Sequence, residues 1–344
     1  MLLPLMCDPQ SVGSADVLLV ESTFGNRLHK TLQDTEEELV AEVTETFARG
    51  GNLVIPAFAV GRTQEVIHVL ADLVRRARLP KLTVFVDSPM ATAASAATSK
   101  FSRLLDDEAH LVSDSMMRHK THFNLRFTAT VRESRRSSRS PAARLIIAAS
   151  GMCNAGRILH HLAQNLPRRQ SAVLITGFQA QGTLGRRLVA GANEIRLFGQ
   201  RVPVKARLYT IGGLSAHPDR AGLLAWLGAF KRPPGQTFVV HGEHANGIAF
   251  AETIRTTLNW PHVTVPVRGD VHLLALNRAS HACAKKRPLT RGPFFRNTDL
   301  SDALDLFQHL ESRFRCAGKH ALEYLGKATT LKRVAAGAFA FGHD

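Results

Sequence analysis

The chain has 344 residues, of which 44% are hydrophobic, so it can bury one large core or two smaller ones. Its four cysteines show no Cys-x-x-Cys spacing, which argues against a disulfide framework and a thiolate zinc site and fits a reducing cytoplasmic environment. No apolar stretch is long enough to span a membrane. The formal net charge of +16 favours a polyanionic partner, and nucleic acid is the natural one, with anionic membranes or acidic proteins as alternatives.

The first predicted element is an apolar strand over residues 15–21 that ends in the carboxylate of Glu21. A helix follows, because Thr35 and Glu38 have the spacing of a capping box. Apolar residues then recur at helical spacing until Gly50, at Leu39, Val43 and Phe47.

Residues 52–59 and 82–87 read as buried strands, and each is followed by a polar turn and a helix. Such repeated strand–helix units predict an α/β fold with a mostly parallel sheet covered by helices. The turn after the first of these strands carries Gly61, Arg62 and Thr63 at a helix start, which suits phosphate, although an ordinary strand-to-helix turn is the common alternative.

Two further strand–turn–helix segments carry glycines and arginines at their turns. The first contains Ser150, Gly151 and Arg157 after the strand 145–149. The second follows the strand 173–175 and contains Gln179, Gly182, Thr183 and Arg186. Glycines let a sugar-phosphate backbone approach closely, whereas simple helix–sheet packing is the alternative interpretation of each turn.

Two histidines stand where apolar runs end. His217 follows Ser215 in the stretch 211–220, and His241 follows the strand 237–240. A rigid sheet aims such side chains while the loop keeps them accessible, so a functional site is expected there. Taken singly, each histidine is also compatible with a core or surface position.

These segments, in this order, resemble the β-CASP branch of the metallo-β-lactamase superfamily, which contains RNA and DNA nucleases. The resemblance rests on the stretch ending at Glu21, on Ser215-Ala-His217-Pro-Asp219 and on His241-Gly-Glu243, and it covers about positions 10 to 275. It implies a partial metallo-β-lactamase αββα sandwich with an inserted β-CASP α/β domain. The implied domains are 1–26 as a residual lactamase-like strand, 27–203 as the β-CASP domain, 204–275 as the C-terminal lactamase-like part and 276–344 as a basic tail.

The resemblance also implies roles for single residues. In the family two zinc ions share a bridging hydroxide that attacks phosphorus. By resemblance His241 would be a zinc ligand, His217 would donate a proton or stabilise the transition state, and Glu21 would orient His217. The residues expected to bind substrate are Arg62, Thr63, Ser150, Gly151, Arg157, Gln179, Gly182, Thr183, Arg186 and Ser215.

The chain departs from the family pattern in its metal ligands. None of its sixteen histidines forms a His-x-His pair, so the family's His-x-His-x-Asp-His signature is absent and at most weak, partial zinc binding is expected. Three explanations are open: the C-terminal portion of a nuclease, a catalytically inactive RNA-binding relative or partner of a complete nuclease, or an enzyme with an unrelated site. A Rossmann-type enzyme is disfavoured because no Gly-x-Gly-x-x-Gly follows a strand.

The expected partner is RNA, with DNA as the alternative. A homodimer, or a second polypeptide that supplies the family's N-terminal metal-binding half, is a further expectation. No membrane partner is expected. Beyond position 276 the chain is basic, and an amphipathic helix is predicted over residues 301–324. No family resemblance extends into that tail.

Overall fold

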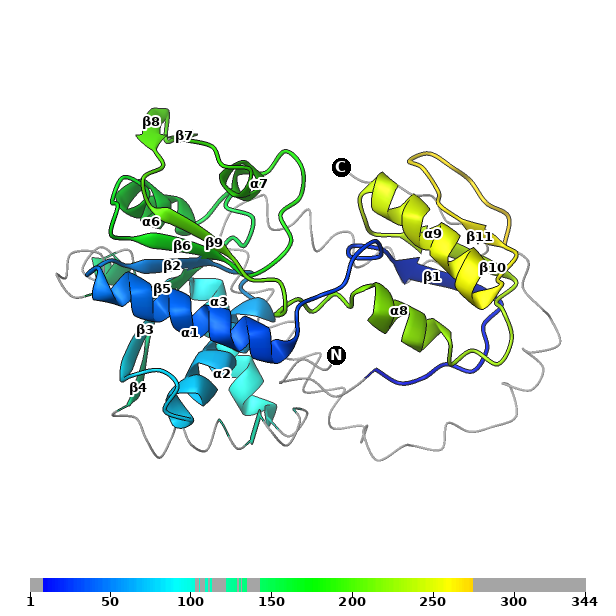
Figure 1. Cartoon of the computed structure of the whole chain (residues 1–344), viewed down its shortest axis with the longest axis horizontal. Helices are drawn as coiled ribbons and strands as arrows, with labels where there is room; N and C mark the ends of the chain where they lie inside the picture. The colour runs from blue at the N-terminus through cyan, green and yellow to red at the C-terminus, as the bar shows by residue number, and fades with distance from the viewer. Residues whose placement is uncertain are drawn as a thin grey trace. The chain divides into compact units, whose positions relative to one another are not determined.

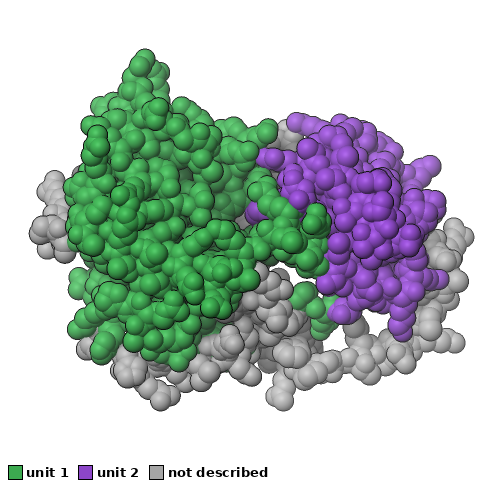
Figure 2. Space-filling model, viewed as in Figure 1, with its two compact units in different colours: residues 1–10, 27–222 green, residues 11–26, 223–344 purple. Residues whose placement is uncertain are grey.

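The computed structural model describes residues 9–102, 122–128 and 143–274 and, between them, residues 105, 109, 110, 112, 130 and 132–134. The tail after position 276, with the helix predicted there, lies outside the described residues. The chain forms two compact units (Figure 2). The larger unit contains residues 27–222, and the smaller unit contains residues 11–26 and the chain from residue 223 onward.

The larger unit alternates strands and helices. Its elements, in chain order, are α1 (Leu32–Ala48), β2 (Leu53–Pro56), α2 (Arg62–Arg75), β3 (Leu82–Val86), α3 (Pro89–Lys100), β4 (Phe123–Phe127), β5 (Leu145–Ala148), α6 (Ile158–Asn165), β6 (Ala172–Ile175), α7 (Leu184–Val189), β7 (Glu194–Leu197), β8 (Gln200–Pro203) and β9 (Arg207–Thr210). Six strands form one sheet in the order β4-β3-β5-β2-β6-β9, and every neighbouring pair is parallel. The predicted α/β class with a mostly parallel sheet is confirmed.

Helices cover both faces of this sheet (Figure 1). Leu53 and Ile55 of β2 pack with α1, α2 and α3, whereas Val54 points to the opposite face, where α6, α7 and the β7–β8 hairpin pack. Because side chains alternate along a strand, a strand buried on both faces is apolar throughout, and the all-buried strands β2, β5 and β6 have that character.

The start of α1 differs from the sequence prediction. Its N-cap is Thr31, whose hydroxyl accepts a hydrogen bond from the backbone N–H of Asp34 at 3.0 Å. The predicted cap, Thr35, lies within the helix, where it is buried and donates to the carbonyl of Thr31 at 2.8 Å. Thr31 is the N-cap because its backbone is extended, with ψ of 158°, which is the conformation that a cap residue takes.

The smaller unit contains a three-stranded parallel sheet in the order β1-β10-β11, built from β1 (Val17–Glu21), β10 (Gln236–Val240) and β11 (Val263–Thr264). Its helix α9 (His244–Leu258) follows β10. Helix α8 (Arg220–Leu227) starts within the last residues of the larger unit and continues into the smaller one. The core joins Leu18, Val20 and Val239 to residues of both helices. Among the residues described, no helix combines the length and the apolar character needed to cross a membrane.

Strand β9 is assigned differently by the structure and by the resemblance. The resemblance placed residues 204–275 in the lactamase-like part. In the structure Arg207–Thr210 pairs in parallel with β6, with Ala172 opposite Arg207 and Ile175 opposite Thr210, and so extends the sheet of the larger unit. The functional domain boundaries remain predictions.

Candidate functional site

The sheet of the larger unit changes its winding direction near its centre. From β2 the chain continues to β3, two places away on one side, and from β5 it continues to β6, two places away on the other side. The connections that leave the carboxyl ends of the neighbouring strands β2 and β5 therefore run in opposite directions along the sheet. Open α/β sheets bind ligands at this topological position. The turns after β2, β5 and β6, together with the first residues of the helices that follow β2 and β6, form the strand-end cluster, which comprises residues 57–63, 149–157 and 176–186.

The turn after β2 is held by the first residues of α2. The carbonyl of Phe58 accepts hydrogen bonds from the hydroxyl of Thr63 at 2.7 Å and from its backbone N–H at 3.2 Å. Gly61 takes a positive φ of 80° at the helix start. Arg62 forms a largely buried ion pair with Glu65 at 2.9 Å; burial lowers the pKa of Arg62 and raises that of Glu65, while their mutual attraction opposes both shifts.

The turn after β5 is compact because two of its glycines stand against backbone. A Cβ atom on Gly151 would lie 3.0 Å from the backbone nitrogen of Phe58, and one on Gly156 would lie 2.5 Å from the carbonyl oxygen of Ala149. Gly156 also has a φ of 86°. The hydroxyl of Ser150 accepts from the backbone N–H of Ala155 at 3.3 Å.

The turn after β6 is bonded to the turn after β5. The side-chain amide of Gln179 donates to the carbonyl of Gly151 at 3.0 Å, and the N–H of Gly185 donates to the carbonyl of Met152 at 3.1 Å. Thr183 is the N-cap of α7 and accepts from the N–H of Arg186 at 3.2 Å. The turns after β5 and β6 are therefore hydrogen-bonded to each other, and the strand-end cluster contains most of the predicted substrate-binding residues.

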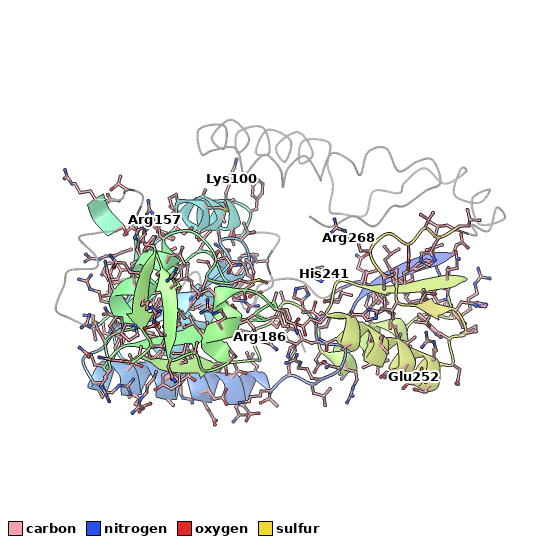
Figure 3. The ribbon with its side chains drawn as sticks, turned by 90° about the horizontal axis from the view of Figure 1, so that it is seen from above. Lys100, Arg157, Arg186, His241, Glu252 and Arg268 are labelled. Atoms are coloured by element: carbon pink, nitrogen blue, oxygen red, sulfur yellow. The ribbon has the colours of Figure 1, made fainter. Side chains whose placement is uncertain are left out.

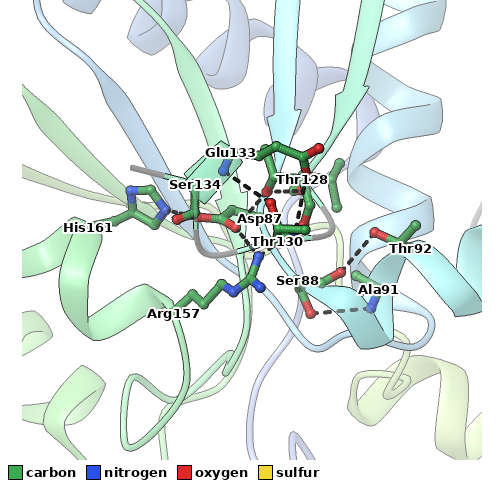
Figure 4. Close-up of polar contacts among 11 residues, drawn as sticks. Asp87, Ser88, Ala91, Thr92, Thr128, Thr130, Glu133, Ser134, Arg157 and His161 are labelled. Carbon is green, nitrogen blue, oxygen red and sulfur yellow. Dashed lines mark hydrogen bonds and ion pairs between the residues drawn. The ribbon is translucent and has the colours of Figure 1, made fainter. Parts of the chain in front are cut away.

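Asp87, which follows β3, is the centre of a buried polar network (Figure 4). Its carboxylate accepts hydrogen bonds from Thr128 Oγ1 at 2.5 Å and Arg157 Nη1 at 2.7 Å on one oxygen, and from His161 Nε2 at 2.6 Å and Ser134 Oγ on the other. Burial alone would raise the pKa of Asp87. The hydrogen bonds, that from His161 first, outweigh it and hold the pKa of Asp87 well below its ordinary value.

This network determines where Arg157 points. Nη1 of Arg157 donates both to Asp87 and to the carbonyl of Thr128, the latter at 2.9 Å, so the guanidinium joins the ends of β3, β4 and β5. His161 completes the arrangement, and its Nδ1 has no hydrogen-bond partner among the described residues. A neutral ring that donates through Nε2 suits that environment, because a protonated Nδ1 would be a buried donor without an acceptor.

In the smaller unit, Glu21 and His241 stand at the ends of the adjacent parallel strands β1 and β10. Thr23 donates its hydroxyl to the carbonyl of His241 at 3.0 Å and lies 3.2 Å from Nδ1 of the same residue. Since that hydroxyl proton is already donated, Thr23 accepts from Nδ1–H, which leaves the lone pair of the ring on Nε2. Glu21 Oε2 lies 3.9 Å from His241 Nδ1.

The donor set of this strand end can be compared with that of a zinc site. A lone pair on Nε2, with Nδ1 held by a neighbour, is the form in which histidine binds zinc. Glu21 and His241 together, however, offer two donor groups, whereas zinc sites take about three or four protein ligands. The pair by itself therefore does not fit a complete zinc site.

His217 belongs to the larger unit, in the loop 211–219. Its N–H donates to the hydroxyl of Ser215 at 3.2 Å, and its carbonyl lies 3.0 Å from Nε2 of His29. Asp219 accepts from the N–H groups of Gly222 at 2.8 Å and His29 at 2.9 Å. Partial burial works against ionisation of Asp219, yet these two hydrogen bonds keep its pKa below the ordinary value. The loop is therefore locally fixed.

Comparison with known proteins gives two family matches. Residues 63–188 match the Beta-Casp domain, and residues 201–266 match the Zn-dependent metallo-hydrolase RNA specificity domain. The chain is 33% identical over 250 residues to Ribonuclease TTHA0252 of Thermus thermophilus, covering 72% of this chain and 56% of that protein. It belongs to the β-CASP branch of the metallo-β-lactamase superfamily.

Two archaeal relatives extend the comparison. An RNase J-like protein of Methanocaldococcus jannaschii is 32% identical over 265 residues, covering 76% of this chain and 59% of the relative. The transcription termination factor FttA of the same organism is 30% identical over 256 residues, covering 70% and 39%. This β-CASP chain thus spans a little over half the length of the ribonuclease and the RNase J-like protein.

The predicted residues divide between these matches. The Beta-Casp match contains Thr63, Ser150, Gly151, Arg157, Gln179, Gly182, Thr183 and Arg186, and the RNA specificity match contains Ser215, His217 and His241. Arg62 and Glu21 precede both matches. The sequence analysis missed the structural roles of Asp87 and Phe58, although each stands at the end of an apolar strand, the same signal that marked Glu21 and His241.

Proposed function

We propose that this β-CASP chain binds single-stranded RNA through the strand-end cluster and takes part in hydrolysis of the RNA phosphodiester chain. The observation that carries the proposal is the assembly of three glycine-containing turns at the winding change of the parallel sheet, of which the turns after β5 and β6 lie within the Beta-Casp match. The match to an RNA specificity domain and the ribonuclease among its relatives support RNA as the substrate class. DNA is the competing substrate.

The chemistry of the cluster suits a sugar-phosphate backbone. Gly61 and Gly182 have open space where a Cβ atom would stand, which lets a ligand approach closely, and the positive end of the α2 dipole favours anions. Figure 3 marks Arg157 and Arg186 in the larger unit and His241 in the smaller one. Because Arg157 is bonded to Asp87, Arg186 is the arginine of the cluster that we expect to contribute more to phosphate binding.

Three residues are proposed for the chemical step on the strength of family membership. His217 would donate a proton or stabilise the transition state, Glu21 would orient His217, and His241 would contribute a metal ligand through Nε2. The hydrogen bond between Thr23 and His241 supports the last role, since it fixes the tautomer with Nε2 as the acceptor. Homodimerisation, or association with a second polypeptide, remains a prediction.

Binding to single-stranded RNA is expected to weaken steeply with salt. The net charge of +16 and the arginines of the strand-end cluster imply release of counterions from the RNA. The logarithm of the binding constant should then fall with the logarithm of the salt concentration, with a slope of roughly −0.7 per phosphate contacted. Fluorescence anisotropy with a labelled RNA and the matching DNA, between low and physiological salt, measures this slope. A flat response, or no binding at low salt, would contradict the proposal.

Replacing Arg186 by glutamine provides the positional test of the same proposal. We expect weaker RNA binding. We also expect a shallower dependence of the binding constant on salt, by about the contribution of one phosphate contact. Arg201→Gln is the matched control, because Arg201 lies on β8 of the hairpin and pairs with Glu194 at 3.5 Å, outside the strand-end cluster. Equal losses in both variants would show that overall charge, and not the cluster, determines binding.

The isolated 344-residue polypeptide is expected to hold fewer than two tightly bound zinc ions. The physical reason is ligand number, since the His-x-His signature is absent and the Glu21–His241 pair offers two donor groups. Elemental analysis after dialysis against a weak chelator measures the content, and His241→Ala serves as the comparison for any partial site. Two zinc ions retained per chain would show that other residues complete the centre.

A further inference from the structure

Phe58 is the exposed side chain in an otherwise buried stretch. Residues 51–57 and Ala59 are buried, whereas Phe58, just past the end of the central strand β2, has 48% of its surface exposed. A phenylalanine in that position forgoes the burial that its neighbours gain. A single exposed apolar residue is not by itself a binding site, so the contacts of the ring decide what it can do.

The Phe58 ring is held in place. Its backbone is fixed by two hydrogen bonds from Thr63, which is 1% exposed, and the preceding N–H of Ala57 donates to Ala148 on β5 at 3.0 Å. One edge of the ring lies against the backbone of Gly151, where an added Cβ would come within 2.9 Å of ring atom Cδ2. A side chain at position 151 would therefore displace the ring. Because residue 151 is glycine, the Phe58 ring keeps its place beside the turn after β5.

The Phe58 ring stands close to a basic side chain and to the turns after β5 and β6. Arg62 lies four positions later, at the start of α2, where it pairs with Glu65, and a Cβ on Gly177 of the turn after β6 would lie 4.0 Å from its Nε. Ser150 and Gly151 lie on the neighbouring strand end. Single-stranded nucleic-acid sites are built in this way, with a basic, amide-rich path for the backbone and aromatic side chains on which bases stack.

We propose that the ring of Phe58 stacks on a base of the bound RNA strand, while the strand-end cluster contacts the adjoining phosphates. This inference rests on the proposed RNA binding and adds a base-contacting subsite to it. The contact is tolerant of sequence, because every base offers an aromatic face. The subsite therefore selects single-stranded over double-stranded RNA, since a paired base is already stacked in the duplex.

The test compares Phe58→Ala with Phe58→Trp. Alanine is expected to weaken binding of single-stranded RNA by about tenfold, within the range of roughly 5- to 150-fold that loss of one stacked base produces. Tryptophan should keep the affinity, and its fluorescence should be quenched on binding. The native tryptophans, Trp226 and Trp260, lie in the smaller unit and give the baseline in the unmodified chain. Phe198→Ala, at an exposed phenylalanine between β7 and β8, is the matched control.

An RNA with a single abasic position, moved along the strand, identifies the contact. The wild-type chain should lose affinity at one position, and Phe58→Ala should show no further loss there. Equal affinities of wild type and Phe58→Ala for intact RNA, with the salt response preserved, would overturn the stacking role and leave RNA binding standing. A lower melting temperature or altered assembly of Phe58→Ala, without a specific abasic effect, would make the ring a packing residue. If the wild type binds no RNA at all, both proposals fail.

Discussion

Substitution of Asp87 by alanine is expected to lower the free energy of unfolding by about 3–5 kcal/mol, because it leaves a partly buried guanidinium and the buried donors of Thr128 and His161 without their acceptor. The carboxylate is fully buried and joins Thr128, which follows β4, to Arg157 and His161, which both follow β5. Urea denaturation at neutral pH, followed by circular dichroism, measures the loss. The Asp87→Asn variant should lose less of the free energy of unfolding, since its amide oxygen still accepts from one pair of donors.

Asp72→Ala is the control for this variant. Asp72 bonds to Arg75 and Arg76 on the outer side of α2, where solvent screens the charges, so a loss below about 1 kcal/mol is expected. Similar losses at positions 72 and 87 would contradict the assignment of Asp87 as the centre of the network.

The Asp87 network also predicts a dependence on pH. The folded-state pKa of Asp87 is lowered, so its contribution to stability is complete above the unfolded value of about 3.9 and is lost as the pH falls towards the folded value. The difference in stability between wild type and Asp87→Asn should therefore be constant near neutral pH and shrink below about pH 4. A difference that instead grows as the pH falls would contradict the ionised, hydrogen-bonded state.

Substitution of Gly51 by alanine is expected to destabilise the larger unit by roughly 2–3 kcal/mol or more. Gly51 lies between α1 and β2, and a Cβ added there would come within 1.7 Å of the carbonyl oxygen of Gln170 and 2.7 Å of the N–H nitrogen of Ser171. Both obstacles are backbone atoms on the approach to β6, so the clash cannot be relieved by a side-chain rotation. The shift in the midpoint of urea denaturation measures the effect.

Gly212→Ala is the matched control, because an added Cβ there meets no atom within 4 Å. Its stability should stay within about 0.5 kcal/mol of the wild type. If Gly51→Ala unfolds at the same urea concentration as Gly212→Ala, the close approach between the two loops is not a constraint on the fold.

Much of the larger unit was predictable because its signals are local. The apolar runs that became β2, β3 and β5 are short and buried, and each is followed by a turn and a helix, which is the pattern of a parallel sheet covered on both faces. The helix after Ser88 and Pro89 likewise follows from a capping hydroxyl and a proline at the helix start. The first turn of α1 was placed wrongly because Thr31 and Thr35 are both suitable cap residues, and backbone conformation selects between them.

The candidate site was predictable residue by residue but not as an arrangement. Arg157 was expected to face a phosphate from its turn alone, yet its guanidinium is bonded to Asp87, 70 positions earlier in the chain. Nothing in the local sequence identifies that partner, because the contact exists only once β3 and β5 lie side by side.

The sequence by itself determined the strands, the turns that follow them and the chemical types of residue at each strand end, since hydrophobic periodicity and backbone preferences act over a few residues. Tertiary structure alone decided which strand ends meet. The order β4-β3-β5-β2-β6-β9 brings Gly151 beside Phe58 and the donors of Thr128, Arg157 and His161 around one carboxylate. The physical reason is that contacts between distant segments depend on how the sheet is wound, which is a property of the whole folded chain.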